Sequence, residues 1–333
     1  MGTLCIPKET KVGEGRVALI PQDVAIVHES GHRVYVEADA GKASGFSNAD
    51  YYAAGAKITA PRNAWQKNTI VAKVKELQDN EFSLIQSNTV IFLFAHFGGN
   101  LAQENFFNAA EIRRIQAVPY EDLRDRSGRS PVLREMSMIA GELAAHIGCE
   151  YMRRDHGGPG LLPQDMAVQI LGAGNAGMRA EHVLRSLGVK TIYQHDRYSR
   201  PSCFDASRKT IAELSKKADL LICCAFDRLF GAPKIITHAM AQGMRKSALI
   251  VDVAIDEGGN CDFSKATTPA HPIFPLSNGV RIYALPNLPG MVPRSSSPRL
   301  SNAALPYILA ALELKKMRRK ISIETIISET SKK

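Results

Sequence analysis

The 333-residue sequence is long enough for two domains of about 150 residues each, because single hydrophobic cores rarely grow much larger. Hydrophobic residues make up 45% of the chain and charged residues 23%, as in globular proteins, and no apolar run approaches the roughly 18 residues that a membrane span needs. The formal net charge of +9 is dispersed apart from residues 315–320 and accompanies no recognition motif, so neither nucleic acid nor membrane is a predicted partner.

The first third of the chain alternates short apolar runs with helical patterns. It begins without the long apolar stretch of a signal peptide, which predicts a cytoplasmic protein. Strands are expected at residues 3–6, 32–37, 69–74, 89–96 and 117–120, and helices over about 23–29 and after residue 48. Strands and helices in this order predict a parallel sheet covered on both faces.

A second α/β series occupies the middle of the chain. A polar crossing at residues 124–130 precedes a long helical pattern from about 131 to 154, which the HGGPG segment at 156–160 ends. Further strands are expected at residues 167–171, 191–194, 220–225, 248–253 and 280–284. A last helix is expected over about 302–320, with Ser301 as its N-cap, and a mixed polar end follows at 322–333.

The stretch LGAGNAG, residues 171–177, has the G-x-G-x-x-G spacing of a dinucleotide-binding loop. An apolar strand precedes it and a helix-forming run follows, with Asn175 and Ala176 between the last two glycines. Gly172 would permit the tight turn, Gly174 would let a pyrophosphate approach backbone N–H groups, and Gly177 would let helix and strand pack closely.

Asp196 stands at the end of the next expected strand, about 20 residues beyond the loop, where a carboxylate binds the adenosine ribose. Its charge would repel the extra phosphate of NADP, so NAD is the predicted cofactor; the adjacent Arg197 keeps NADP open. A strand-to-helix turn without a ligand is the alternative, but turn geometry alone does not require three glycines together with this acid.

Three side chains of the first series are candidates for chemistry: Arg16 in EGRVALIP, Lys75 in AKVKE and His96 in FLFAHFG. Lys75 and His96 directly follow apolar strands, where open α/β sheets place ligand contacts. By residue type alone, Lys75 is as often an ordinary surface lysine and His96 a histidine with satisfied hydrogen bonds. Their joint position at strand ends favours a site. The six cysteines are scattered without a C-x-x-C pair, so no metal site is predicted.

Several separate motifs resemble the alanine dehydrogenase family, which also includes the NAD-binding subunit of proton-translocating transhydrogenase and, more distantly, saccharopine and lysine dehydrogenases. The matching segments, in order, are VAKVKE, LFAHFGGN, MSMIAGELAA, the glycine loop, SALIVDVAIDEGGN and LPNLPGMVPRSSS. The resemblance implies a homo-oligomeric, NAD-dependent amino-acid dehydrogenase that interconverts L-alanine or a related 2-amino acid and a 2-oxo acid by oxidative deamination. The transhydrogenase subunit carries asparagine and tryptophan in place of Lys75 and His96, which favours a substrate dehydrogenase here.

The resemblance also implies residue roles. Arg16 and Lys75 would hold the carboxylate and carbonyl of the 2-oxo acid, and His96 would be the general acid and base. Asp256 would orient His96 or the attacking water. Asn287 would lie near the nicotinamide, and Met136 and Ser137 would contact it. A capped turn is the alternative for Asp256 and Asn287, and core packing is the alternative for Met136.

These observations together predict an α/β protein of two Rossmann-like, doubly wound parallel-sheet domains joined by long helices. Residues 1–130 with 300–333 would form the substrate (catalytic) domain, and residues 131–299 the NAD(H)-binding Rossmann domain. The nucleotide domain is predicted to be shortened, because residues 197–217 are too few for the additional helix and strand of alanine dehydrogenases. Saccharopine dehydrogenases have a similarly short crossing, with a comparable pattern of Ser199, Arg200, Phe204 and Asp205.

Two alternatives to an ammonia-dependent dehydrogenase stay open. Asp227 and Arg228 place charges in a loop that alanine dehydrogenases keep apolar. They would either recognise a polar substrate tail, as in an opine- or saccharopine-type enzyme that condenses an amino acid with a 2-oxo acid, or point to solvent. The shortened crossing suggests the other alternative, a non-catalytic binding protein of the same fold.

Overall fold

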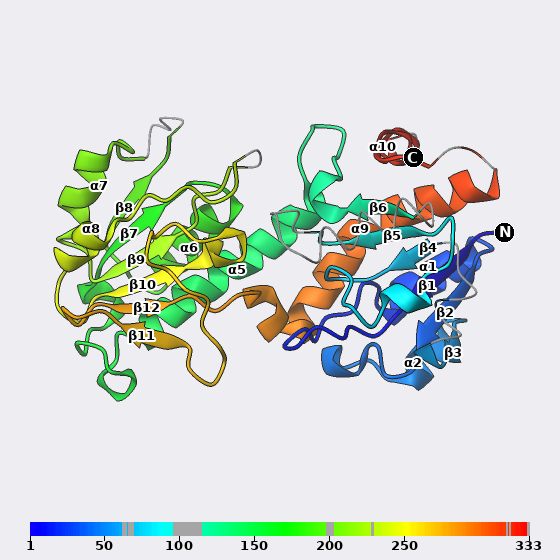
Figure 1. Ribbon diagram of the computed structural model, residues 1–333, viewed down its shortest axis with the longest axis horizontal. Helices are drawn as coiled ribbons and strands as arrows, with labels where there is room; N and C mark the ends of the chain where they lie inside the picture. The colour runs from blue at the N-terminus through cyan, green and yellow to red at the C-terminus, as the bar shows by residue number, and fades with distance from the viewer. Residues whose placement is uncertain are drawn as a thin grey trace. The chain divides into compact units, whose positions relative to one another are not determined.

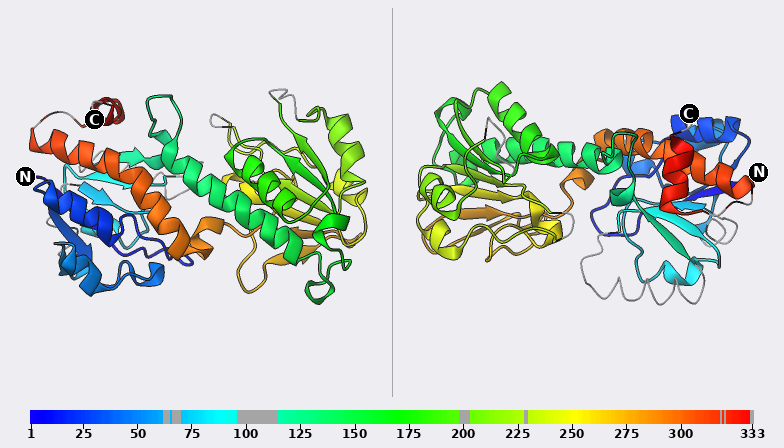
Figure 2. Two further views of the ribbon diagram at one scale, coloured as in Figure 1. Left: turned by 180° about the vertical axis from the view of Figure 1, so that it is seen from behind. Right: turned by 90° about the horizontal axis from the view of Figure 1, so that it is seen from above.

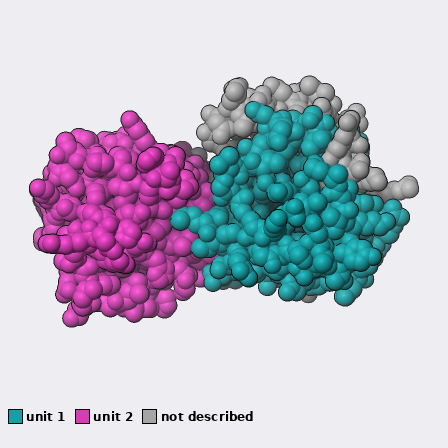
Figure 3. Space-filling view, turned by 90° about the horizontal axis from the view of Figure 1, so that it is seen from below, with its two compact units in different colours: residues 1–136, 289–333 teal, residues 137–288 magenta. Residues whose placement is uncertain are grey.

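The computed structural model describes residues 1–61, 65, 70–95, 115–197, 203–227, 230–317, 319 and 321–331. The chain divides into two compact units, coloured separately in Figure 3: unit 1 is residues 1–136 with 289–333, and unit 2 is residues 137–288. The first boundary falls within helix α5 (Pro131–Glu150), and the second falls in the 3-10 helix Leu288–Met291. A middle segment of the sequence thus forms one unit, and the two ends together form the other.

Unit 1 is built on a six-stranded sheet in the order β3-β2-β1-β4-β5-β6, in which every pair of neighbours is parallel (Figure 1). The strands are β1 (Thr3–Ile6), β2 (Arg33–Glu37), β3 (Lys57–Thr59), β4 (Ile70–Ala72), β5 (Val90–Leu93) and β6 (Gln116–Pro119). Strands added outward in both directions from β1 and β4 give the Rossmann order, which confirms the predicted doubly wound sheet.

The described α-helices of unit 1 outside α5 are α1 (Pro21–Glu29), α2 (Asn48–Ala53), α9 (Pro293–Lys316) and α10 (Ile323–Thr330). Helices α1 and α9 contact each other, and Figure 2 shows them side by side on one face of the sheet. The sequence predicts only a mixed polar end over 322–333, and the structure places α10 within it, at Ile323–Thr330, behind a capping box of Ser322 and Thr325.

The predicted start of α9 is wrong. The helix begins at Pro293, which tolerates the N1 position because its missing N–H would have no partner there, and Ser301 lies in the helix interior. Ser301 does not act as an N-cap. Its buried hydroxyl accepts the backbone N–H of Ile20 at 3.0 Å and contacts the Asp23 carboxylate of α1. The hydroxyl that resembled a cap in the sequence therefore ties α9 to the start of α1.

Unit 2 contains a second six-stranded sheet, in the order β11-β12-β10-β9-β7-β8. Its strands are β7 (Ala167–Leu171), β8 (Thr191–His195), β9 (Leu220–Cys223), β10 (Leu249–Asp252), β11 (Ile273–Pro275) and β12 (Arg281–Tyr283). All neighbours are parallel except β11 and β12. Beyond β8, the described residues form only one parallel bridge, between His195 and Phe204, so β8 is the last full strand on that side.

Helices cover both faces of the unit 2 sheet. Alternate residues of β9 show this, since successive strand side chains point to opposite faces. Leu220 and Ile222 pack in a core with α5 and α6 (Asn175–Ser186), whereas Leu221 and Cys223 pack with α7 (Arg208–Ser215) and α8 (His238–Gln242). None of the helices in the described ranges is long and apolar enough to cross a membrane.

Candidate active site and nucleotide-binding loop

The glycine loop lies where β7 passes into α6, one strand in from the edge strand β8 of the unit 2 sheet. Gly172 has a φ of 100°, and Gly174 is the N-cap of α6, whose first residues are Asn175 and Ala176. A Cβ on Gly177 would lie 1.9 Å from the carbonyl oxygen of Gly172, so only glycine permits the helix to start this close to the strand. A Cβ on Gly174 would meet nothing within 4 Å, so the backbone there borders open space.

A further glycine, outside the motif, shapes the same loop. Gly141 lies on α5, and a Cβ there would lie 2.0 Å from the carbonyl oxygen of Ala176. Beside this close approach, Arg179 of α6 donates to Glu142 of α5 at 2.8 and 3.0 Å. Helix α5 therefore supports the loop directly. The GE pair within MSMIAGELAA is the sequence signal for this contact, although those residues alone do not reveal which helix they meet.

Asp196 and Arg197 follow β8 directly, at the carboxyl edge of the sheet that also carries the glycine loop. Asp196 is half-buried and Arg197 is exposed. The Nη2 atom of Arg197 lies 2.5 Å from Oδ2 of Asp227, which follows β9, the strand on the other side of β7. The other oxygen of Asp227 accepts the backbone N–H of Phe230 at 3.2 Å. The Asp227 carboxylate is thus engaged within unit 2, while Arg228 lies outside the described residues.

The loops after β9 and β10 are joined by Asn260, which is completely buried. Its Oδ1 accepts from the N–H of Ala225 at 3.0 Å, and its Nδ2 donates to the carbonyls of Ala225 and Pro233 at 2.8 and 3.0 Å. Its own N–H donates to buried Asp252 at 3.1 Å. The side-chain amide of Asn260 thus binds backbone groups as a neighbouring strand would, and it fixes the backbone conformation of both loops.

Two residues that the family resemblance selects lie together in unit 2. Asp256 belongs to the 3-10 helix Val253–Glu257, and its Oδ2 accepts the backbone N–H of Asn287 at 2.8 Å. Asn287 itself has a φ of 62°, which is uncommon for a residue with a side chain and is best tolerated by asparagine and aspartate. Asp256 therefore holds the turn that presents Asn287. Its carboxylate is exposed, whereas Asn287 is half-buried.

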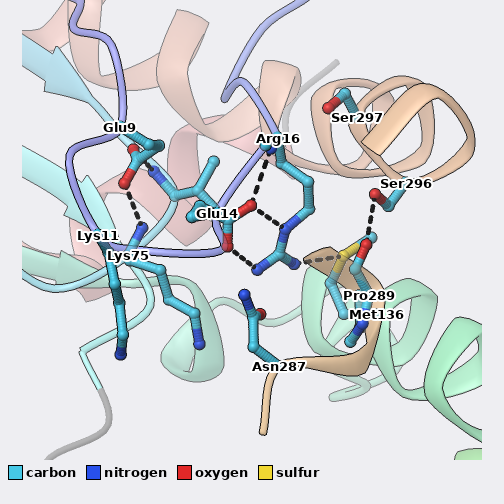
Figure 4. Close-up of polar contacts among 12 residues, drawn as sticks. Glu9, Lys11, Glu14, Arg16, Lys75, Met136, Asn287, Pro289, Ser296 and Ser297 are labelled. Atoms are coloured by element: carbon cyan, nitrogen blue, oxygen red, sulfur yellow. Dashed lines mark hydrogen bonds and ion pairs between the residues drawn. The ribbon is translucent and has the colours of Figure 1, made fainter. Parts of the chain in front are cut away.

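In unit 1, Arg16 is held by Glu14. Arg16 Nε and Nη2 donate to the two oxygens of Glu14 at 2.8 and 2.5 Å, a bidentate pair in which both side chains are almost fully buried (Figure 4). Its Nη1 lies 3.2 Å from Sδ of Met136, at the start of α5. Because a guanidinium is planar, these contacts set the orientation of Arg16 from within unit 1. Ser137, the next residue, begins unit 2 and is half-buried.

Lys75 follows β4, the immediate neighbour of β1 in the sheet, and is 2% exposed. Arg16 lies in the segment between β1 and α1, and Figure 4 shows Arg16 and Lys75 in one region of unit 1. His96 lies outside the described residues. The N–H of Ala95, directly before it, donates to Glu121 at 3.0 Å, which anchors the end of this segment.

Glu14 and Glu121 are not among the residues to which the sequence motifs point. Glu14 has a local signal, since it precedes Arg16 by two residues in EGR. Glu121 follows β6 in the 3-10 helix Tyr120–Asp122, and its relation to Ala95 arises only because β5 and β6 pair. No group of three or more His, Cys, Asp or Glu side chains suited to a metal ion occurs among the described residues.

Comparison with known proteins accounts for both units. The family model "Alanine dehydrogenase/PNT, N-terminal domain" matches residues 5–140, and "Alanine dehydrogenase/PNT, C-terminal domain" matches residues 144–331. Alanine dehydrogenase 1 of Staphylococcus aureus is 33% identical over 327 residues, covering 92% of this chain and 86% of that protein.

Solved structures agree with the family models. An L-alanine dehydrogenase superposes with a TM-score of 0.86 at 29% identity, covering 99% of this chain and 93% of its own. A transhydrogenase from Sinorhizobium meliloti superposes with a TM-score of 0.80 at 25% identity, covering 94% and 95%. The Rossmann-type order of both sheets, the glycine loop and these matches over nearly the whole sequence lead to one conclusion: the chain belongs to the alanine dehydrogenase/PNT family.

Proposed function

We propose that this protein is an NAD-dependent amino-acid dehydrogenase that catalyses the reversible oxidative deamination of L-alanine or a related 2-amino acid. The observation that carries the proposal is the likeness to an L-alanine dehydrogenase over 99% of the chain. The buried cations Arg16 and Lys75, which lie in one region of unit 1 (Figure 4), support it, because a 2-oxo acid offers a carboxylate and a carbonyl to such groups.

The residues of unit 2 fit a dinucleotide. Gly174 borders open space at the start of α6, where backbone N–H groups and the helix dipole favour a pyrophosphate. Asp196 stands at the end of β8, where it can accept hydrogen bonds from ribose hydroxyls. The bound cofactor supplies the hydride acceptor. Met136, Ser137 and Asn287 stay proposed contacts of its nicotinamide.

The protein's own groups would bind the substrate and move protons. Arg16, oriented by Glu14, would bind the substrate carboxylate, and Lys75 would hydrogen-bond the carbonyl oxygen of the 2-oxo acid. Oxidation at the α-carbon leaves an imine. Water adds to this imine while His96 removes a proton from the water. Ammonia then departs with a proton and leaves the 2-oxo acid. Asp256, which holds the turn of Asn287, would orient His96 or the attacking water.

NADH oxidation tests the proposal and separates it from an opine- or saccharopine-type reaction. The assay supplies pyruvate or 2-oxoglutarate, each first with ammonium and then with lysine. We expect turnover with pyruvate and ammonium, whereas turnover that requires lysine would establish the condensing reaction instead. Asp227 and Arg228 favour a substrate with a polar tail, but the Asp227 carboxylate is engaged by Arg197 and by the N–H of Phe230, and Arg228 lies outside the described residues.

A fluorescence titration of NADH tests whether the protein is a catalyst or only a binding protein. We expect saturable NADH binding together with turnover of an oxo acid. Saturable binding without turnover of any amino-acid or oxo-acid pair would instead identify a non-catalytic member of the family.

Cytoplasmic location and homo-oligomeric assembly stay predictions. Light scattering coupled to size exclusion measures the assembly state directly, and cell fractionation measures the location. A monomeric mass at micromolar concentration would contradict the predicted homo-oligomer.

A further inference from the structure

A buried ionic cluster lies directly beneath Lys75 in unit 1. Its centre is Lys73, whose side chain is completely buried. The Nζ atom of Lys73 lies 3.1 Å from Oε2 of Glu9 and 3.3 Å from Oε2 of Glu81. It also donates to the backbone carbonyls of Lys75 at 2.9 Å and Glu76 at 3.2 Å. All the donors of this ammonium are thus directed at partners inside the protein.

The Glu9 carboxylate accepts hydrogen bonds from backbone N–H groups of the same segment. Its Oε1 accepts from Val74 at 2.6 Å, and its Oε2 lies 3.3 Å from the N–H of Lys75 (Figure 4). The cluster therefore holds Lys75 by both of its backbone polar groups: Glu9 binds the N–H, and Lys73 binds the carbonyl. Lys75 itself is 2% exposed and follows β4, and both polar groups of its backbone are bound, so its backbone is held in place.

Glu81 completes the cluster from the next turn of the chain. Its oxygens accept from the hydroxyl of Thr10 at 3.0 Å and from the N–H of Gln78 at 2.9 Å. The segments after β1 and after β4 are therefore joined through ionic groups on both sides of Lys73. The acidic charges that face this lysine come from both segments, and Glu76, on the same loop, pairs with Lys11 at 2.5 Å.

Stability alone is a weak reason to bury such a cluster. Removing an ammonium and carboxylates from water costs about as much as their attraction returns, and well-packed apolar residues of similar volume often stabilise a fold equally well. Burial accordingly raises the pKa of Glu9 despite its ammonium partner. What the ionic cluster provides and an apolar core cannot provide is a directional hold on the N–H and carbonyl of one residue.

We propose that Glu9 and Lys73 are positioning residues for Lys75, which they hold in the backbone geometry that presents its ammonium to the carbonyl of a 2-oxo acid. The inference rests on the proposed role of Lys75 in substrate binding. A displacement of such a group by about 1 Å lowers reactivity on the order of 100-fold. A loop held only by packing would permit such displacements, so Lys75 would lose most of its contribution to the reaction.

The test is the replacement Glu9→Gln in the full-length protein. The amide keeps the shape of the side chain, but it cannot accept from both Val74 and Lys75 and it loses the charge opposite Lys73. We expect the KM for pyruvate to rise about tenfold and kcat/KM to fall by about 10- to 100-fold, with the NADH dissociation constant within twofold of wild type. The milder Glu9→Asp, which keeps the charge but withdraws it by one methylene, should give a smaller shift in the same direction.

Asp23→Asn is the matched control. Asp23 is another buried carboxyl of unit 1 whose pKa is raised by burial, and its contact with Ser301 joins α1 to α9. It should lower the melting temperature as Glu9→Gln does and leave the KM for pyruvate unchanged. A KM shift of the same size in Asp23→Asn would show that the effect of Glu9→Gln reflects a general destabilisation of unit 1, and it would overturn the inference.

Lys75→Met separates failure of this inference from failure of the proposed function. If Lys75→Met leaves kcat/KM unchanged, the role proposed for Lys75 is wrong. If Lys75→Met removes activity while Glu9→Gln and Glu9→Asp both keep the wild-type KM, only the positioning role is wrong.

Discussion

The two sheets of this protein share a winding order but differ at one edge. In unit 1 the strands run β3-β2-β1-β4-β5-β6, with a third strand outside β2. In unit 2 the equivalent position outside β8 holds only the bridge between His195 and Phe204 among the described residues. The missing outer strand is tolerable because the glycine loop follows β7, the neighbour of β8, and Asp196 follows β8 itself, so neither depends on a strand farther out.

The two units also bury different kinds of polar group at their carboxyl edges. Unit 1 buries full charges, in Arg16 with Glu14 and in Lys73 with Glu9 and Glu81. Unit 2 places close-packed glycines there, together with the side-chain amide of Asn260 and the buried carboxyl of Asp252, which accepts the Asn260 N–H. Fixed cations suit a small carboxylate substrate, whereas exposed backbone N–H groups suit a pyrophosphate. Variants in unit 1 should therefore change substrate parameters, and variants in unit 2 should change cofactor binding.

The largest effect is expected from His96→Ala, which removes the proposed general acid and base. Turnover should fall by about 10²–10⁴-fold, and NADH binding, measured by fluorescence, should be unchanged. His96 lies outside the described residues, so this prediction rests on the family resemblance. Unchanged turnover would remove His96 from the mechanism, and lost NADH binding would break the division between the units.

Gly177→Ala should have the next largest effect. The new methyl group would meet the carbonyl of Gly172, so α6 must shift, which should lower the free energy of unfolding by about 1–3 kcal/mol and weaken NADH binding. Gly174→Ala is the matched variant. Its methyl group enters open space, so it should weaken NADH binding while the urea unfolding midpoint changes little. If both variants bind NADH normally, the loop is only a turn.

Asp227→Asn should have a smaller effect, on cofactor preference. It removes the carboxylate that pairs with Arg197, and the positive charge of this exposed guanidinium then favours a 2′-phosphate, so NADPH binding should tighten about two- to fivefold, with NADH binding unchanged. Asp219→Asn is the control, because Asp219 pairs with Arg245 at the opposite, amino edge of the same sheet. Equal changes in both variants would show that the effect is not local to Arg197.

The smallest effect is a local dependence on pH at His195. Its Nδ1 donates to the carbonyl of Asp205 at 2.7 Å and its Nε2 faces the amide nitrogen of Gln169 at 2.9 Å, so the folded ring is neutral. Burial lowers the pKa of His195 below its ordinary value of 6.5. Below that pH the unfolded segment takes up a proton that the folded one does not, so local stability should fall as the pH decreases, down to the folded pKa.

Hydrogen exchange of residues 203–208 measures this effect separately from the titration of His32 in unit 1, whose pKa is also lowered by burial. Exchange should accelerate, after correction for its intrinsic rate, between pH 7 and the folded pKa, and His195→Gln should abolish the change. A pH-independent exchange in the unaltered protein would show that His195 does not hold the shortened crossing.

Much of the fold was predictable because its signals are local. Apolar runs bounded by turn residues marked the inner strands, and LGAGNAG marked the turn from β7 to α6. The start of α9 was not predictable in this way. Pro293, Pro298 and three serines suggest a loop, and only contacts such as that of Ser301 with Ile20 and Asp23 make a helix of this segment.

The sequence by itself determined the two α/β series, the glycine loop, the acid after β8 and the cations of the first half, because each depends on residues near one another along the chain. Tertiary structure alone decided how those cations are held. Glu9 and Lys73 are 64 residues apart and meet only because β1 and β4 pair in parallel. Likewise, the charge that meets Arg197 is Asp227, 30 residues away, because a parallel sheet collects the ends of distant strands at one edge.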